Sequence, residues 1–392
     1  MDQAAVLGGK EQHIIDMRRW LHMHPEESLK EYDTAAYIEQ QLDALALPHR
    51  RVGETGVYAW LDTGRPGPVT VLRADIDALK VQDLKNVPYR SQRDGYSHSC
   101  GHDMHTAALL GTAQALVQRK EQLTGQVRFL FQQAEEIGAG ARQFIQAGCM
   151  QGADRVLGLH ADSSLRSGKV AIMAGPNNAS CDAFTITIKG KSAHVSTPHL
   201  GVDALYIASL LVVALQGLAT RLTDPTDPVI IGVGKLTAGN AYNALADVAV
   251  LEGTTRLMSA DTRELINRKV RELAEGLAQQ YGGSARAVFQ AYAPVLVNDA
   301  DVVGELHQLY QDVPGMHIVP QRGPKLGADD MADLLNEVKG AYLYVGTWNE
   351  QDPNTGVAHH NGYFDVDEQA LLLGAQLLTR YALHRHLEAA QA

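Results

Sequence analysis

Apolar and polar residues follow two different periods in the first half of the chain. Helical spacing occurs over residues 11–23 (EQHIIDMRRWLHM) and again over residues 34–47. Strand-like runs follow at residues 57–61, 69–75, 127–133 and 155–162. The middle two runs are rich in apolar and β-branched residues, which is typical of strands buried on both faces. A helix rich in alanine and leucine is predicted between these two, at residues 106–117. The alternation predicts a layered α/β domain.

The pattern changes near Ala179. Residues 182–190 alternate strictly between apolar and polar, which indicates a sheet with one lightly covered face. The elements that follow are a helix at 203–222, strands at 229–239 and 247–257, a helix at 262–281 and a strand at 286–295. This β-α-β-β-α-β order is the split βαβ arrangement. A strand at 341–348 and a helix at 367–383 then return to the α/β pattern. We therefore expect a discontinuous domain, residues 1–178 and 296–392, interrupted by a smaller domain, residues 179–295.

Composition narrows the class of protein. The chain has 392 residues, 45 % hydrophobic and 20 % charged, which is ordinary for one large or two medium globular domains. Its formal net charge of −11 argues against nucleic acid or an anionic membrane as a partner. The three cysteines, Cys100, Cys149 and Cys181, are too widely spaced to suggest a disulfide framework. We find neither a signal-peptide pattern nor a run of about eighteen apolar residues, so we expect a reduced, cytoplasmic protein.

The segment SHSCGHDMHTAA, residues 97–108, is the first candidate for chemistry. A Cys-x-His spacing on a loop lets Cys100 and His102 reach one metal ion, and Gly101 between them relieves the turn. A polar loop that caps a helix explains the same residues. A third interpretation is a thiol nucleophile with its base, which needs an orienting group and an oxyanion hole that the sequence does not single out.

Other strand and loop ends carry the same residue types. Two carboxylates, Glu135 and Glu136, close an apolar strand, and one can bind a metal while the other acts as a base. A solvated strand end is an alternative explanation for these two carboxylates. His160 ends another predicted strand, and alone it could equally be a structural histidine with its hydrogen bonds satisfied. Further acids and histidines lie at Asp75, Asp77, His359 and His360. Together they supply thiolate, imidazole and carboxylate donors for two divalent ions.

With these motifs in place, the chain resembles the dinuclear metallopeptidase superfamily of aminoacylase and the glutamate carboxypeptidases. Its amidohydrolase branch, with hippurate hydrolases, indole-acetyl-amino-acid hydrolases and N-acyl-amino-acid deacylases, is the most similar. The motifs are RRWLHMHPEESLKEYDTAAYI, LRADIDALK, HSCGHDMHTAALLGTA, FLFQQAEEIGAGARQFIQAG, LGLHAD, GKSAHVSTPHLGVDAL, GNAYNALADVAVLEGTTR and HNGYFDVDE. The resemblance implies a catalytic α/β domain with a mixed sheet and an inserted ferredoxin-like dimerisation, or lid, domain.

The resemblance also implies roles for single residues. The implied metal ligands are Cys100, His102, Glu136, His160 and His360, with the Cys100 thiolate close to both ions. Glu135 matches the general base, and Asp77 matches an acid that supports the site. His98, His105 and His359 are expected to be structural or supporting residues.

In the insert, His194 resembles a lid histidine that reaches the partner subunit's active site, while Asn243 and Arg256 match substrate-binding residues. Ordinary surface polar residues remain an alternative for these three. The chain departs from the usual motifs at Lys80, Ser99 and Asp329, which leaves the shape of the substrate pocket open.

The expected activity is hydrolysis of the amide bond of N-acyl amino acids or small dipeptides by a metal-activated water. Two Mn²⁺ or Zn²⁺ ions per subunit are the expected cofactors. Glu135 is expected to transfer the proton, and His194 is expected to stabilise the oxyanion from the other subunit of a homodimer. Two alternatives are a cysteine-dependent hydrolase using Cys100 and a non-catalytic binding protein that contains metal. Glu135 argues against the second alternative, because a binding protein does not need a base beside the metal ligands.

Overall fold

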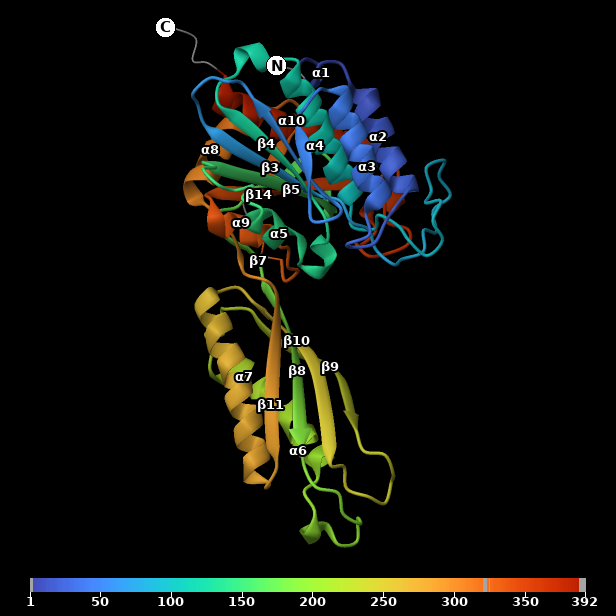
Figure 1. Cartoon of the computed structure of the whole chain (residues 1–392), viewed down its shortest axis with the longest axis vertical. Coiled ribbons are helices and arrows are strands. Elements are labelled where there is room, and N and C mark those ends of the chain that lie inside the picture. The colour runs from blue at the N-terminus through green and yellow to red at the C-terminus, as the bar shows by residue number, and fades with distance from the viewer. Residues whose placement is uncertain (1–2, 320–322, 324, 388–392) are drawn as a thin grey trace. The chain divides into compact units, whose positions relative to one another are not determined.

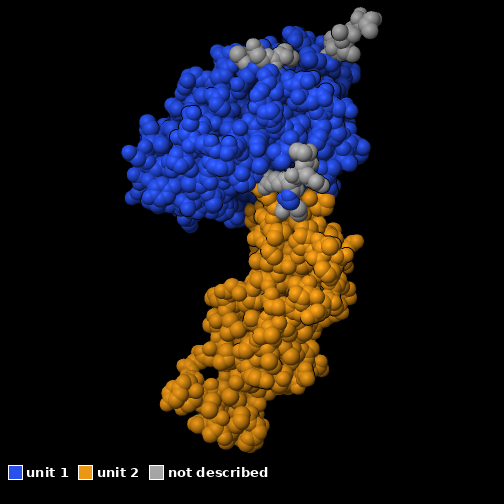
Figure 2. Space-filling view, turned by 180° about the vertical axis from the view of Figure 1, so that it is seen from behind, with its two compact units in different colours: residues 1–175, 297–323, 330–392 blue, residues 176–296, 324–329 orange. Residues whose placement is uncertain are grey.

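The chain forms two compact units in the computed structural model, which describes residues 3–319, 323 and 325–387 (Figures 1 and 2). Unit 1 consists of Met1–Gly175, Val297–Gly323 and Asp330–Ala392, and unit 2 of Pro176–Leu296 and Pro324–Asp329. The predicted insert, residues 179–295, falls within unit 2. Its assignment as a lid or dimerisation domain stays a prediction.

Among its described residues, unit 1 contains a mixed sheet of eight strands in the order β1-β2-β4-β3-β5-β14-β6-β13. Strands β4, β3, β5 and β14 run parallel to their neighbours in this central block, whereas β1 and β2 pair antiparallel at one edge. The parallel strands therefore present their carboxyl ends at one edge of the sheet. The strands are β1 (His49–Val52), β2 (Gly56–Asp62), β3 (Val69–Asp75), β4 (Gln126–Gln132), β5 (Arg155–Arg166), β6 (Lys169–Ala171), β13 (His317–Val319) and β14 (Gly340–Trp348).

Helices cover this sheet, and the central strands are apolar because they are buried on both faces. Almost every residue of β3 and β14 is buried. Helix α4 packs on β3 and contacts both α2 and α10. Gly111 allows a close approach there, since a Cβ atom on it would lie 2.6 Å from Cδ1 of Ile14. The helices are α1 (Gln3–Leu7), α2 (Glu11–Met23), α3 (Tyr32–Ala44), α4 (His102–Val117), α5 (Gly140–Gln146), α8 (Ala300–Tyr310), α9 (Met331–Glu337) and α10 (Glu368–His386), with 3₁₀ turns η1 (Lys120–Gln122), η2 (Glu135–Ile137) and η4 (Pro353–Gly356).

Unit 2 is an α+β sandwich whose described strands form a four-stranded antiparallel sheet in the order β11-β8-β10-β9. Its elements run β8-α6-β9-β10-α7-β11, the order that the apolar pattern predicted. Helices α6 and α7 pack on each other and on the sheet, and their apolar residues form a separate core. The elements are β8 (Ser180–Lys189), η3 (Pro198–Leu200), α6 (Ala204–Arg221), β9 (Val229–Ala238), β10 (Val248–Leu257), α7 (Ala260–Gln280) and β11 (Ser284–Ala293). β7 (Gly175–Asn178) and β12 (Leu296–Asn298) contain the points where the chain passes between the units.

Helix α6 is unusually apolar. Within the described residues it is the one helix whose length and mean hydropathy of 1.5 would suit a membrane span, although 33 % of that window is buried in the protein. Our expectation counted uninterrupted apolar residues, and the serine, glutamine and threonine residues of α6 interrupt the run. Ile207, Leu211 and Leu215 face the core of unit 2 at helical spacing, while Val213 on the other side is 73 % exposed.

The structure confirms the predicted fold class, an α/β unit with a large mixed sheet and a second α+β unit. Two local predictions were wrong. Helix α4 begins at His102 rather than at residue 106. Strand β5 continues past His160 to Arg166 because its parallel pairing with β14 extends beyond that histidine.

Candidate metal centre

Residues from four separate segments of unit 1 meet near the carboxyl ends of β3 and β4, next to the middle of β5. They come from the start of α4, from η2 after β4, from β5 and from the loop before α10. Potential ligand atoms within each three-residue group lie within 4.8 Å of one another. The residues brought together are Cys100, His102, Glu135, Glu136, His160 and His360. These are the residues that the sequence placed at the metal site.

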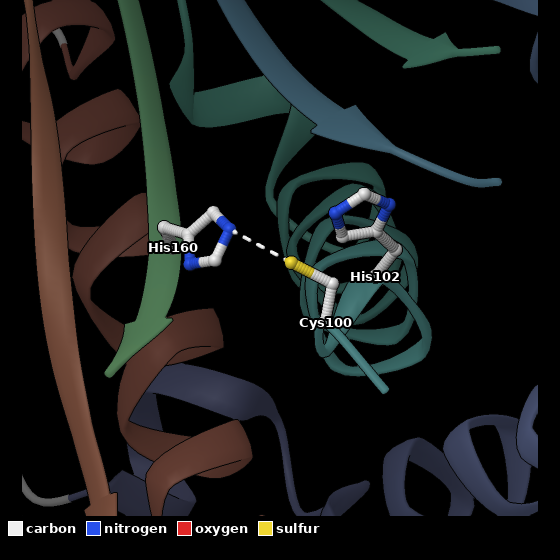
Figure 3. A group of neighbouring side chains, drawn as sticks. All are labelled: Cys100, His102 and His160. Atoms are coloured by element: carbon white, nitrogen blue, oxygen red, sulfur yellow. Dashed lines mark hydrogen bonds between the residues drawn. The ribbon is translucent and has the colours of Figure 1, made fainter. Parts of the chain in front are cut away.

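Cys100 belongs to two of these groups. One group adds His102 and His160, and the other adds Glu136 and His360. Figure 3 shows the first group, with Sγ of Cys100 3.6 Å from Nε2 of His160. In the second, Nε2 of His360 is 3.5 Å from Oε1 of Glu136. Two sets of donors that share one thiol form an arrangement suited to two neighbouring ions.

Glycine is required between the candidate ligands Cys100 and His102. Gly101 is the N-cap of α4 and has a φ of +93°. A Cβ atom on it would lie 2.9 Å from the Cβ atom of Ala161, which follows the ligand His160 on β5. The left-handed turn thus lets Cys100 precede the helix while His102 occupies its first position. His360 also has a positive φ, +62°, and its N–H donates to the carbonyl oxygen of Ser99 at 2.8 Å.

Hydrogen bonds fix the ring tautomers of two histidines. Nδ1 of His102 lies 3.2 Å from Oδ1 of Asp77, and Nδ1 of His160 lies 2.6 Å from the carbonyl oxygen of Ala161. Because both partners only accept, each Nδ1 carries a proton, which leaves Nε2 as the nitrogen that could bind a metal ion. Nε2 of His102 and Oε1 of Glu136 are buried and have no hydrogen-bond partner among the described residues. Coordination to a metal ion would satisfy these two buried atoms, so the residues fit divalent ions.

Asp77 connects the two sides of the site. Its Oδ2 accepts the backbone N–H of Glu136 at 3.0 Å and the hydroxyl of Ser28 at 2.6 Å, while its Oδ1 faces His102. Burial alone would raise the pKa of Asp77, but these hydrogen bonds outweigh it and hold the pKa below its usual value. Asp77 is therefore held as a carboxylate that orients a ligand from each of two elements. Ser28 was not predicted, since a serine in the loop before α3 carries no signal of its own.

Asp75, His102 and His105 form another group with the composition of a metal site. His105 cannot serve as a ligand there, because both its ring nitrogens are already used. Its Nδ1 lies 2.6 Å from Oδ1 of Asp75, and its Nε2 accepts the N–H of Ala161 at 2.8 Å. His105 thus anchors β5 next to the candidate ligand His160. The position of His105 three residues after His102 is the sequence signal for this role.

His98 is buried beside the centre, and His359 is half-buried there. Burial lowers the pKa of His98 to about 3 and that of His359 to about 4. Both imidazoles are therefore neutral at physiological pH in the metal-free chain. The ring of His359 lies 5.3 Å from that of His160 and 4.7 Å from that of Phe364, measured between ring centroids, and is tilted against both.

Glu135 lies beside the ligands in the 3₁₀ turn η2. Its side chain is buried, and its Oε2 is 4.0 Å from Nε2 of His102. The turn leaves β4 through Ala134, which has a left-handed backbone with a φ of +56°. This bend separates the directions of Glu135 and Glu136, so that one carboxylate contacts the ligand group of Cys100 and His360 while the other lies next to it. A carboxylate in this position can accept and return a proton.

Comparison with known proteins agrees with this geometry. Residues 71–384 match the model of peptidase family M20/M25/M40, which is more than half of the chain. The chain belongs to this family. The resemblance inferred from the motifs is thereby confirmed.

Named relatives of this M20 family chain include an N-acetylcysteine deacetylase of Bacillus subtilis, 34 % identical over 94 % of this chain and 96 % of the relative. An N-acyl-L-amino acid amidohydrolase of Geobacillus stearothermophilus is 38 % identical over 73 % of this chain and 78 % of its own length. Among solved structures, a dinuclear metal-binding M20 peptidase of Bacillus subtilis superposes with a TM-score of 0.83. It is 33 % identical and covers 96 % of this chain and 98 % of its own.

The remaining predicted site residues of the M20 chain lie in unit 2, at two different ends of its sheet. His194 and Asn243 are exposed neighbours, since the N–H of Val195 donates to the carbonyl oxygen of Asn243. The N–H of Ser196 donates to Nδ1 of His194 at 3.1 Å, which places the ring proton on the exposed Nε2. Arg256 lies near the other end of β10, eight residues after its first residue, Val248, or about 26 Å along the strand. Unit 2 brings the first two residues together but not the third.

Proposed function

We propose that this chain hydrolyses the amide bond of N-acyl amino acids or small dipeptides with the help of two divalent metal ions. The observation that carries this proposal is the pair of ligand groups that share Cys100, with Glu135 buried beside them. The names of the relatives, a deacetylase of N-acetylcysteine and an amidohydrolase of N-acyl-L-amino acids, support the substrate class.

The reaction requires a nucleophile and a protonated leaving group. Divalent ions in such a site lower the pKa of water and polarise a carbonyl oxygen. Glu135 accepts the proton of the attacking water and then donates it to the amide nitrogen as the C–N bond breaks. Asp77 keeps the Nδ1 proton on His102, so that this ligand does not compete for the transferred proton.

The ions that we propose are Mn²⁺ or Zn²⁺. One thiol, three imidazoles and a carboxylate form a mixed soft and hard donor set that both ions accept. All three cysteines lie among the described residues and are unpaired, which supports a reducing compartment such as the cytoplasm.

We also propose a homodimer formed through unit 2. The exposed side of α6 carries Tyr206 and Val213, which are 50 % and 73 % exposed. Strand β9, which contacts α6 and lies at one edge of the four-stranded sheet, exposes Ile230 and Leu236 by 40 % and 37 %. An apolar helix face beside an unpaired strand edge favours association with a second copy.

The positions of the unit 2 residues support the same assembly. One small substrate cannot contact His194 and Arg256 of the same unit 2, because about 26 Å of strand β10 separates their ends of the sheet. If all three polar residues bind substrate, two copies must contribute to one site. We propose that His194 acts from the partner subunit, with its Nε2 proton stabilising the oxyanion, and that Asn243 beside it binds substrate from the same partner subunit. Arg256 then binds substrate from the other copy.

The activity is tested by removing metal and refilling the enzyme with Mn²⁺, Zn²⁺ or Co²⁺. Hydrolysis of acetyl, benzoyl, aminobenzoyl and indole-acetyl amino acids and of dipeptides is then measured. We expect activity to return only with metal, and Glu135→Gln to keep the metal while kcat falls by about 10²–10⁴-fold. Near-normal turnover by Glu135→Gln would contradict the assignment of the base. Activity that survives chelation but is lost on alkylation of Cys100 would favour a thiol nucleophile instead.

The assembly is tested by light scattering of the wild type and of Val213→Lys combined with Leu236→Lys. We expect a dimer that the double variant converts to monomers, with a fall in activity. The matched surface control is Val288→Lys. Val288 is 51 % exposed and lies on β11, at the opposite edge of the sheet from β9. A monomeric wild type with full activity contradicts both the dimer and the role of His194.

A further inference from the structure

The segment that carries Glu135 and Glu136 is held in an unfavourable backbone conformation. Ala134 has a φ of +56°, a region that residues with a Cβ atom rarely adopt. Its side chain is fully buried and offers no polar group that could stabilise the turn. A left-handed alanine persists only when the surrounding structure determines it. The residues that bind the backbone of this turn therefore decide where the two glutamates point.

Two carboxyl groups accept hydrogen bonds from the backbone of this turn. Oδ2 of Asp77 accepts the N–H of Glu136 at 3.0 Å, as described above. Oε1 of Glu31 accepts the N–H of Ala134 itself at 2.9 Å. Glu31 is completely buried, and its other oxygen, Oε2, accepts the hydroxyl proton of Thr55 at 2.6 Å. Thr55 lies in the connection between β1 and β2, so the carboxyl group of Glu31 is fixed at both oxygens.

The position of Glu31 in the chain makes this arrangement informative. Glu31 is the N-cap residue of α3, yet its side chain makes no capping hydrogen bond within the described helix. Glu26 does so instead, accepting the N–H groups of Asp33 at 3.2 Å and of Thr34 at 2.7 Å. The helix is thus capped by another acid, and the side chain of Glu31 turns away from its own helix toward Ala134.

The loop that leads to Glu31 also reaches Asp77. The hydroxyl of Ser28 donates to Asp77, and the N–H of Ala78 donates to the carbonyl oxygen of Glu26 at 2.7 Å. Leu29, with a φ of +65°, turns the chain between Ser28 and Glu31. One short loop, residues 26–31, therefore contacts the ends of both β3 and β4 just where their functional residues begin.

We propose that Glu31 is a positioning residue of the metal centre, which holds the left-handed turn at Ala134 and so aims Glu135 and Glu136. This inference rests on the proposed function for the roles of these two glutamates. Glu31 itself does not contact the ligand groups. Burial, and then the nearby Asp77, raise the pKa of Glu31 to about 7, whereas its hydrogen bonds to Thr55 and Ala134 act in the opposite direction and favour the ionised carboxylate.

The test compares Glu31→Ala with Glu31→Gln. Glutamine keeps an oxygen for the N–H of Ala134, and its amide group can donate to the hydroxyl of Thr55. We expect Glu31→Ala to lower kcat by about 10- to 100-fold with KM changed less than about threefold, because misplacing a catalytic group affects turnover more than substrate binding. Glu31→Gln should restore most of kcat. The matched control is Glu39→Ala, which removes a glutamate of α3 that binds Arg51 at the surface.

Hydrogen exchange gives a readout that does not depend on activity. In metal-free protein, the amide of Ala134 should exchange faster in Glu31→Ala than in the wild type, Glu31→Gln or Glu39→Ala, measured by mass spectrometry on peptides spanning residues 133–139. Unchanged exchange or unchanged kcat in Glu31→Ala overturns the inference. Equal loss of kcat in Glu31→Gln and Glu31→Ala also overturns it, because the charge or proton of Glu31 would then matter rather than its position.

Two further outcomes are separable. If the wild type hydrolyses none of the substrates offered, the proposed function fails, whereas the exchange experiment still decides whether Glu31 holds the turn. If Glu31→Ala does not fold, Thr55→Val replaces it, since this change removes the hydroxyl that fixes the carboxyl group. A several-fold fall in kcat with faster exchange at residue 134 then supports the inference, and wild-type values for both overturn it.

Discussion

Replacing Asp77 by asparagine changes one atom and is expected to disable one of the two metal positions. The carboxylate of Asp77 accepts from three donors, Nδ1 of His102, the hydroxyl of Ser28 and the N–H of Glu136. Asparagine has one accepting oxygen and one donating amide. If the oxygen faces Glu136, the amide donates to Nδ1 of His102, which moves the ring proton to Nε2 and blocks the lone pair that would bind metal. If the oxygen faces His102, the amide meets the N–H of Glu136.

The size of the effect follows from the bonds that cannot be made. Either orientation leaves at least one buried donor unsatisfied or one ligand in the wrong tautomer. A buried polar group without its partner costs about 1–3 kcal/mol. That cost corresponds to about 5- to 150-fold in a binding constant. The orientation with the oxygen toward Glu136 is favoured, because this position accepts two of the three bonds, from Glu136 and Ser28. We therefore expect the ion proposed for Cys100, His102 and His160 to bind about 5- to 150-fold more weakly in Asp77→Asn, and the other ion to be less affected.

The assay is a competition titration of metal-free protein against a chromophoric chelator, fitted with two sites for Zn²⁺ and again for Mn²⁺. The matched control is Asp154→Asn, because Asp154 accepts the N–H of Val69 at the amino end of β3. Circular dichroism establishes that both variants are folded. Wild-type affinity at both sites of Asp77→Asn would refute the argument that this carboxylate sets the tautomer of His102.

Three other predictions follow from particular contacts. Gly101→Ala should destabilise the protein by more than about 1 kcal/mol and weaken metal binding. In the control, Gly95→Ala, the glycine has a φ of +79° but no atom of the described residues lies within 4 Å of the new Cβ, so only the backbone strain should be lost in stability. Urea denaturation measures the stability of each variant, and metal titration measures its metal affinity. Asp83→Asn should cost about 3–5 kcal/mol in urea denaturation because it leaves the ammonium of Lys85, 3.0 Å away and buried, without its counter-ion; a loss below about 1 kcal/mol would contradict this. Burial would raise the pKa of Asp83, but His22, Ser91 and Lys85 hold the pKa below its usual value. The stability that this carboxylate contributes is therefore present above a pH of about 4 and is lost on acidification. The free energy of unfolding of Asp83→Asn should accordingly depend less steeply on pH in acid. Zinc at 100 times its dissociation constant should raise the free energy of unfolding by about 2.7 kcal/mol over the chelated protein, and equal melting temperatures with and without metal would argue against a centre formed only in the folded chain.

Much of the fold was predictable because long elements carry strong periodic patterns. Helix α7 buries Ile266, Val270 and Ala274 at intervals of four, and strand β8 alternates buried and exposed residues along most of its length. The elements that were missed are short, such as the three-residue strands β6 and β13 and the seven-residue helices α5 and α9. Helix α8 is an exception, since Val302, Leu306 and Tyr310 share a buried face and Asp299 caps its start. The sequence therefore contains a clear helical signal for α8.

The candidate ligands were predictable because cysteine, histidine and glutamate concentrate at the ends of apolar strands. What surrounds them was less visible. The bond from Ser28 to Asp77 joins residues 49 positions apart, and nothing local marks a serine as the partner of a distant carboxylate. His105 was recognisable as a residue near the ligands, but its role in holding Ala161 depends on the pairing of β5 with its neighbours. The sequence separations of these contacts explain why spacing rules find the ligands and miss their supports.

Backbone strain is the feature of the centre that is hardest to predict from the residue types. Among the described residues, the non-glycine positions with positive φ are Leu29, Ala46, Ala134 and His360. A glycine such as Gly101 suggests a left-handed turn, whereas an alanine or a histidine does not. The conformations of Ala134 and His360 could therefore not be predicted from the sequence. Each is held by a bond from a distant segment, Glu31 to Ala134 and Ser99 to His360. Three of the four strained positions, all but Ala46, thus lie at the metal centre or in the loop that supports it. Strain concentrated in this way indicates that the fold holds the ligands in place through tertiary contacts rather than through local preference.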